Sequence, residues 1–173
     1  MVFLDESSAN TCLTPRYARA PKGERAPGTA PRNHQQNTTL VAAVRRDGLQ
    51  APMTLLGALD SDAFAVYLRE FLIPTLQPGQ LVVCDNLSVH KRADIRLLIE
   101  EAGCQLLFLP PYSPDYNPIE LVFSKVKERL RRLAARTQEA LEDAIAEALA
   151  SVSRADVVAF FRHCGYQIDG QPL

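Results

Sequence analysis

Two acidic residues stand at the ends of apolar runs that have the composition of buried strands. Asp85 follows Leu81–Cys84, and Asp5 follows Val2–Leu4 near the start of the chain. Short runs rich in Val and Leu are typical of strands that are buried on both faces. When two such strands lie side by side and parallel, their last residues project from the same edge of the sheet, where ligands of open α/β sheets bind.

A third acid stands at a predicted helix start. Glu120 follows Asn117 and Pro118; Asn is a favoured N-cap, and Pro is favoured at the first helical position. Residues 107–114, which precede them, indicate a strand that leads into a stiff, proline-rich turn. A helix that begins after this turn could place Glu120 across from the other two acids.

Three carboxylates close together repel one another unless cations neutralise them. Mg²⁺ and Mn²⁺ prefer carboxylate oxygen, and a pair of such ions stabilises the attacking and leaving oxygens of a phosphoryl displacement. We therefore predict that Asp5, Asp85 and Glu120 meet in space and are both the catalytic residues and the metal ligands of an enzyme that cuts or joins DNA. The expected cofactor is Mg²⁺, replaceable by Mn²⁺, bound as two ions.

Each acid also has an interpretation without catalysis, and only their joint occurrence favours the enzyme. Glu120 stands three residues after Asn117, the position at which a capping box bonds the backbone. Asp85 before Asn86 is typical of an Asx turn, and an acid near a chain terminus is usually solvated. We expect His90 to be structural.

Length and composition favour one soluble globular domain over residues 1–173, with 47% hydrophobic and 23% charged residues. No apolar run is long enough for a membrane span, and the first residues do not form a secretory signal. Four scattered cysteines without a Cys-x-x-Cys pair indicate free thiols in a reducing cytosol, and three distant histidines argue against zinc.

The order of elements predicts an α/β fold. We expect strands at residues 2–5, 11–17, 38–46 and 51–59, the last three forming an antiparallel meander with a turn at Asp47 and Gly48. A helix from Ser61 to Pro74 follows, then strand 80–85, helix 91–102 and strand 105–109. Strand 2–5 can then lie parallel to strand 80–85, joined by a right-handed crossover. Helices are expected at 117–136, 137–150 and 153–163.

Positive charge is concentrated in two stretches although the net charge is −1. One is a basic loop between residues 16 and 32, and the other lies on the helix after Glu120. A local basic patch can bind phosphate even on a near-neutral chain, although such runs are most often a solvated helix face. The residues predicted to contact DNA are Arg19, Lys22, Arg25, Lys91, Lys125, Lys127 and Arg131.

Two motifs resemble a known family. Residues 85–90 read Asp-Asn-Leu-Ser-Val-His, and residues 109–120 read Leu-Pro-Pro-Tyr-Ser-Pro-Asp-Tyr-Asn-Pro-Ile-Glu. Together with Asp-Glu-Ser at 5–7, they resemble the catalytic domain of mariner-like bacterial insertion-sequence transposases, which are DDE (Asp-Asp-Glu) superfamily endonucleases. The resemblance implies a ribonuclease-H-like fold, a mixed five-stranded sheet flanked by helices. It also implies Mg²⁺-dependent cleavage at transposon ends and strand transfer into target DNA.

The resemblance covers nearly the whole chain, but members of the family carry an N-terminal helix-turn-helix region that we expect to be absent here. The chain is then half of a split reading frame or a truncated remnant. Expected partners are transposon-end and target DNA, with a second copy or a separate helix-turn-helix polypeptide, in the bacterial cytoplasm at the nucleoid. The alternatives are an inactive remnant that at most associates with intact transposase, and a ribonuclease or resolvase of the same fold.

Overall fold

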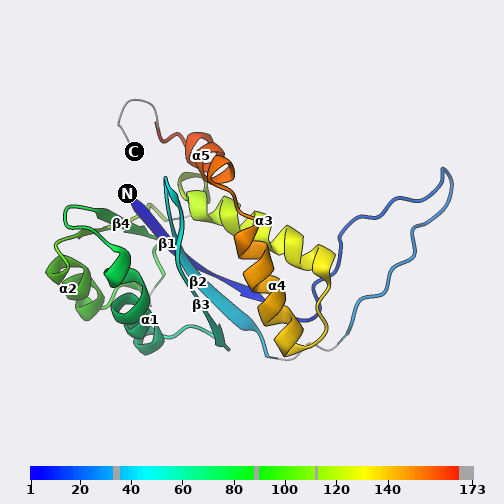
Figure 1. The fold of residues 1–173 in the computed structure, drawn as a ribbon, viewed down its shortest axis with the longest axis horizontal. Coiled ribbons are helices and arrows are strands. Elements are labelled where there is room, and N and C mark those ends of the chain that lie inside the picture. The colour runs from blue at the N-terminus through cyan, green and yellow to red at the C-terminus, as the bar shows by residue number, and fades with distance from the viewer. Residues whose placement is uncertain (33–35, 88–89, 112, 168–173) are drawn as a thin grey trace.

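The computed structural model describes residues 1–32, 36–87, 90–111 and 113–167. The motif residues Ser88, Val89 and Tyr112 lie outside this part of the chain. The described residues form a five-stranded mixed sheet with helices on both faces (Figure 1), so the predicted architecture is confirmed. The strands are β1 (Val2–Ala9), β2 (Thr38–Arg45), β3 (Gly48–Leu56), β4 (Leu81–Cys84) and β5 (Gln105–Phe108), in the spatial order β3-β2-β1-β4-β5.

The central pair of strands is the one that positions the acids. β1 and β4 are parallel, and Leu4 pairs with Cys84. The next residue on each strand is an acid, so Asp5 and Asp85 leave this pair at the same edge. The prediction that the two strands are neighbours and parallel is therefore correct.

β1 is longer than predicted, and the strand expected at residues 11–17 is absent. β1 runs on to Ala9, and its residues from Phe3 onward pair with β2, antiparallel, up to the pair Ala9 with Thr38. The three-stranded meander therefore consists of β3, β2 and β1. Residues 10–17 have no neighbouring strand with which to pair; they form turns and then irregular chain. Without a partner, the short β-prone run at 11–14 cannot satisfy its backbone groups in a sheet.

Helices cover the two faces of the sheet as separate layers (Figure 1). On one face lie α1 (Ser61–Tyr67), the π-helical turn η1 (Leu68–Leu72), the 3₁₀ turn η2 (Ile73–Thr75) and α2 (Ala93–Glu101). On the other lie α3 (Pro118–Leu133), α4 (Gln138–Ala150) and α5 (Arg154–His163). The alternating side chains of β1 serve both cores: Val2 and Leu4 pack toward the first layer, and Phe3 packs toward the second.

Several helix boundaries differ from the prediction; α2, expected at 91–102, runs from Ala93 to Glu101. Asp60, rather than Ser61, caps α1, because its Oδ1 accepts the backbone N–H groups of Asp62 and Ala63. The helix expected to run unbroken to Pro74 changes its hydrogen-bond pattern after Tyr67. α3 ends at Leu133 instead of Arg136, since Ala134 adopts a left-handed conformation with φ 50°.

Between β1 and β2 the chain makes an excursion away from the body of the molecule, drawn in blue in Figure 1. Residues 15–30 are all exposed. All four cysteines are free, as predicted. Among the helices of the described residues, none is both long and apolar enough to cross a membrane.

Candidate active site

Asp85 is held in place by two hydrogen bonds to one of its oxygens. Its Oδ1 accepts the backbone N–H of Leu87 at 3.0 Å, which is the Asx turn that the sequence indicated, and it also lies 2.7 Å from Nδ1 of His90. Partial burial raises the pKa of Asp85, but these two hydrogen bonds outweigh burial and hold the pKa below its ordinary value. Asp85 is therefore ionised and held in one orientation. Its part in the Asx turn is compatible with a part in the site.

His90 is completely buried between two carboxylates. Its Nδ1 faces Asp85, its Nε2 lies 3.2 Å from Oε2 of Glu6, and its ring packs on Phe64 with centroids 4.5 Å apart. Burial lowers the pKa of His90, but the hydrogen bonds to Asp85 and Glu6 reverse that effect and raise it to about 9. At neutral pH His90 is thus an imidazolium that donates both N–H groups and joins the loop after β4 to β1.

Asp5 is almost fully buried, with 5% of its surface exposed. Its Oδ1 accepts the backbone N–H of Glu6 at 2.8 Å, and its Oδ2 accepts Nδ2 of Asn117 at 2.9 Å. Burial raises the pKa of Asp5, the Glu6 N–H opposes this effect, and the negative charges of Glu120, Asp85 and Glu6 add to it, so that the pKa is about 7. The carboxylate therefore sits in a negative environment that disfavours its ionised form.

Glu120 lies in the first turn of α3 and is exposed. The capping box considered from the sequence does not form, because Asn117 makes no side-chain capping bond. The first turn is closed instead by a backbone bond from Glu120 N–H to the Asn117 carbonyl, at 3.1 Å. The Glu120 carboxylate therefore does not take part in capping α3.

Asp85 and Glu120 line the same cavity, which has a volume of about 540 Å³. Lys91 and Asn117 also line it, and the rest of its wall comes largely from the turn between β5 and α3. Asn86 holds this turn in place through a hydrogen bond from its amide to the Leu109 carbonyl. Asp5 lies behind Asn117, to which it is bonded. The structure therefore brings Asp85 and Glu120 to one cavity and places Asp5 against its wall.

Among the described residues, no three His, Cys, Asp or Glu side chains are arranged so that they could hold a metal ion as they stand. Both oxygens of Asp5 and one oxygen of Asp85 accept hydrogen bonds within the protein. The donor set nevertheless fits a hard divalent cation, because it consists of carboxylates. The pKa of Asp5 is raised first by burial and then by neighbouring negative charge, and a bound cation would neutralise that charge. Catalysis and metal binding by the three acids stay predictions.

The residues predicted to contact DNA lie in four different settings. Arg19, Lys22 and Arg25 are exposed in the excursion, and Lys91 lines the cavity with the acids. Lys127 and Arg131 line a second cavity of about 640 Å³ together with Arg16 and Tyr17. Lys125 differs, because its Nζ lies 2.5 Å from Oδ2 of Asp156 at the start of α5, an ion pair that engages its charge within the protein.

Three contacts at the site do not follow from the sequence patterns: Glu6 with His90, His90 with Asp85, and Asn117 with Asp5. The one local signal for His90 was its position five residues after Asp85. Asn117 reaches Asp5 across 112 residues of chain, a contact that no local pattern contains.

Comparison with known proteins agrees with this fold. The family model described as DDE superfamily endonuclease matches residues 1–142. A Mos1 transposase paired-end complex with left transposon end aligns with TM-score 0.74 and 17% identity, over 94% of this chain and 51% of that one. The Mos1 mariner paired end complex with Mn aligns with TM-score 0.72 and 18% identity, over 95% and 51%.

The catalytic domain of Mos1 mariner transposase aligns with TM-score 0.66 and 16% identity, over 95% of this chain and 74% of that domain. At these identities the structural matches establish the fold. The chain spans about half the length of the transposase chains in the two complexes. No curated protein sequence matches the chain significantly.

Proposed function

Because this chain belongs to the family of DDE superfamily endonucleases, we propose that it is the catalytic unit of a transposase, cutting DNA at transposon ends and joining the ends to a target. The observation that carries the proposal is the placement of three acids from distant parts of the chain. Asp85 and Glu120 line one cavity, and Asp5 is buried at its wall in the negative field of both.

Asp5, Asp85 and Glu120 are the residues that would hold divalent cations, Mg²⁺ or Mn²⁺. When bound, such ions stabilise the charge that develops on the attacking and leaving oxygens of a phosphodiester. A Mos1 complex with Mn and one with Mg have been solved, which supports the same choice of metal here. No side chain of this protein is needed as a nucleophile, since water or a DNA 3′-hydroxyl serves.

The other residues of the cavity bind and orient. His90 fixes the rotamer of Asp85 through the 2.7 Å bond to its Oδ1, so the second oxygen keeps a constant direction. Lys91 is exposed and lines the same cavity, and it would bind the phosphate next to the reacting one. Its charge also lowers the pKa of Asp85. This effect is smaller than that of burial, which raises the pKa, and than those of the His90 and Leu87 hydrogen bonds, which lower it.

The DNA backbone would continue from this cavity along the basic face of α3. Arg16, Lys127 and Arg131 converge on the second cavity, and the 91% exposed ring of Tyr17 lies beside them. Contacts of this kind position a duplex without reading its sequence. Reading of the end sequences would fall to a helix-turn-helix region, with the protein acting as a homodimer or together with a separate helix-turn-helix polypeptide at the bacterial nucleoid.

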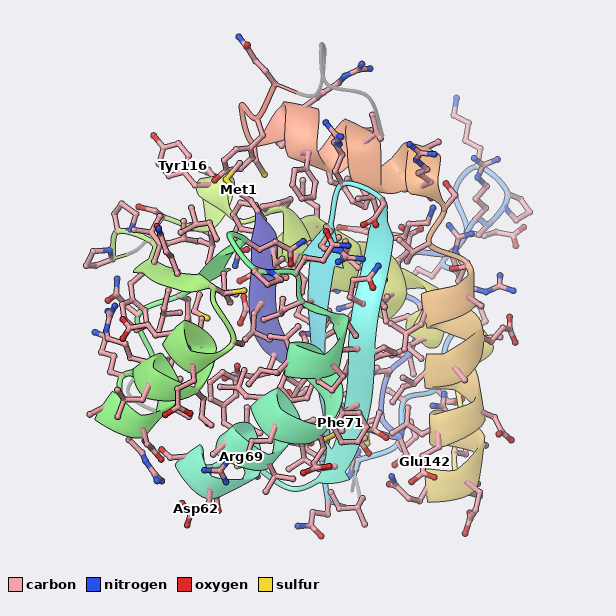
Figure 2. The ribbon with its side chains drawn as sticks, turned by 60° about the vertical axis from the view of Figure 1, so that its left-hand side comes forward. Met1, Asp62, Arg69, Phe71, Tyr116 and Glu142 are labelled. Atoms are coloured by element: carbon pink, nitrogen blue, oxygen red, sulfur yellow. The ribbon has the colours of Figure 1, made fainter. Side chains whose placement is uncertain are left out.

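The proposal is tested by nicking of duplex DNA that carries the cognate ends, with Mg²⁺ or Mn²⁺ and with chelator as the metal-free control. Wild-type protein is expected to nick, Glu120→Gln to lose nicking, and Glu142→Gln on the exposed surface of α4 (Figure 2) to retain it. Equal activity of wild type and Glu120→Gln would contradict the assignment. A folded wild type that is inactive in every condition would identify the inactive remnant instead, and preferential cleavage of RNA–DNA hybrids a ribonuclease.

A further inference from the structure

Asn117 occupies the N-cap position of α3 but does not cap the helix. Its backbone is extended, with φ −111° and ψ 94°, as an N-cap requires, yet its side chain makes no bond to the first turn. The helix gives up the stabilisation that an Asn at this position normally provides. Tyr116, the residue before it, lies at the surface (Figure 2), whereas Asn117 is only 3% exposed.

The side chain is directed to Asp5 instead. Nδ2 of Asn117 donates to Oδ2 of Asp5 at 2.9 Å, in a buried contact between the start of α3 and the end of the β1–β4 pairing. The other amide atom, Oδ1, is buried without a hydrogen-bond partner among the described residues. A buried acceptor without a partner costs stability, so the arrangement is unfavourable for folding in two respects.

The same residue is in contact with both parts of the site. Asn117 lines the cavity shared by Asp85 and Glu120, and Glu120 lies one helical turn further along α3. A rigid first turn therefore connects the residue that holds Asp5 to the residue that carries the third acid.

We propose that Asn117 is a positioning residue of the active site. Its side chain fixes the Asp5 carboxylate and holds β1 in a constant position relative to the start of α3, so that Asp5 and Glu120 keep a constant separation. This inference rests on the proposed function for its consequence, because the fixed separation matters only if both acids bind the same cations. Partners that orient metal ligands typically change metal affinity or activity 10–100-fold when they are removed.

Asn117→Ser separates positioning from structure. Ser is too short to span the distance to Asp5, but it is as good an N-cap as Asn, so the variant can cap α3. We expect its thermal midpoint without metal to equal or exceed that of wild type, while Mn²⁺ affinity, measured by titration, falls at least tenfold. Asn37→Ser, the same change at an exposed residue that bonds Asn10, is the matched control and is expected to leave both quantities unchanged.

Unchanged Mn²⁺ affinity in Asn117→Ser would overturn the proposal. So would a loss of affinity that merely follows a lowered thermal midpoint, because that pattern belongs to a structural role. Loss of affinity with retained stability supports positioning.

The contact itself is tested without metal by a double-mutant cycle of Asn117→Ser and Asp5→Ala on the free energy of unfolding. If wild type bound no Mn²⁺ at all, the proposed function would fail, and the cycle would then decide the inference alone. Additive effects would refute the Asn117–Asp5 contact, and non-additive effects would support it.

Discussion

Replacing Asp5 by Asn is expected to make the metal-free protein more stable while removing its activity. Asp5 has an ordinary pKa of 3.8, and burial together with neighbouring negative charge raises it to about 7 in the folded state. Between these two values the folded protein binds more protons than the unfolded chain. The free energy of unfolding therefore falls as the pH rises through this window, and the loss is complete above about pH 7.

The size of the effect follows from the shift. A displacement of about three pKa units, at about 1.4 kcal/mol per unit, corresponds to roughly 4 kcal/mol of stability lost between pH 4 and pH 8. Asn at position 5 does not ionise, so the variant escapes this loss. Its new amide also has a partner available, because Asn117 has a buried Oδ1 that accepts no hydrogen bond from the described residues and could accept one after the Asn117 amide rotates.

The assay is urea unfolding of wild type and Asp5→Asn, in chelator, at several pH values from 4 to 8. The difference in unfolding free energy should be small near pH 4 and should grow to a few kcal/mol in favour of the variant at pH 8. Asp47→Asn, an exposed acid paired with Arg45, is the control and should show no such trend. A variant that is less stable than wild type at pH 8, or a difference that does not change with pH, would refute the reasoning.

Three further changes test other parts of the account. His90→Phe removes a fully buried imidazolium and leaves the carboxylates of Asp85 and Glu6 without their cationic partner; we expect a loss of about 3 kcal/mol in unfolding free energy near pH 6, measured by urea unfolding. Because the pKa of His90 is raised to about 9, its stabilisation is complete below its ordinary value of 6.5 and disappears as the pH rises through 9, so the difference should narrow at pH 10. Lys127→Ala should weaken DNA binding and reduce the slope of log affinity against log salt by about one, whereas Lys125→Ala, whose charge is already paired, should change the slope less; equal slopes would contradict the assignment. Ala134→Gly should increase the unfolding free energy by about 1 kcal/mol and therefore raise the thermal midpoint, because Gly adopts the left-handed conformation at φ 50° without strain. An unchanged midpoint would contradict this prediction.

Local patterns of apolar residues correctly predicted those strands and helices that have one or two apolar faces. β4, β5 and the parallel pairing of β1 with β4 follow from short apolar runs separated by a helical segment, and the resulting edge carries Asp5 and Asp85 as expected. The strand predicted at residues 11–17 was wrong because β propensity says nothing about whether a neighbour exists. β1 itself takes that place in the meander by running on to Ala9.

The site was harder to predict, because its geometry depends on contacts between distant residues. Asn117 has every local property of an N-cap, and only the folded chain shows that its side chain bonds Asp5. His90 and Glu6 become partners across 84 residues, a contact that neither segment predicts by itself. The acids themselves could be identified from the sequence, whereas their hydrogen-bond partners depend on tertiary packing and could not.

The central claim is that three acids form a working metal centre, and calorimetric titration with Mn²⁺ tests it most directly. Wild type, Asp85→Asn and the surface control Asp47→Asn should be compared with cognate-end DNA present, so that phosphate completes the coordination. The account predicts saturable Mn²⁺ binding by wild type and Asp47→Asn, and its loss in Asp85→Asn with the fold intact. Equal binding by all three proteins, or none by a well-folded wild type with DNA, would contradict it.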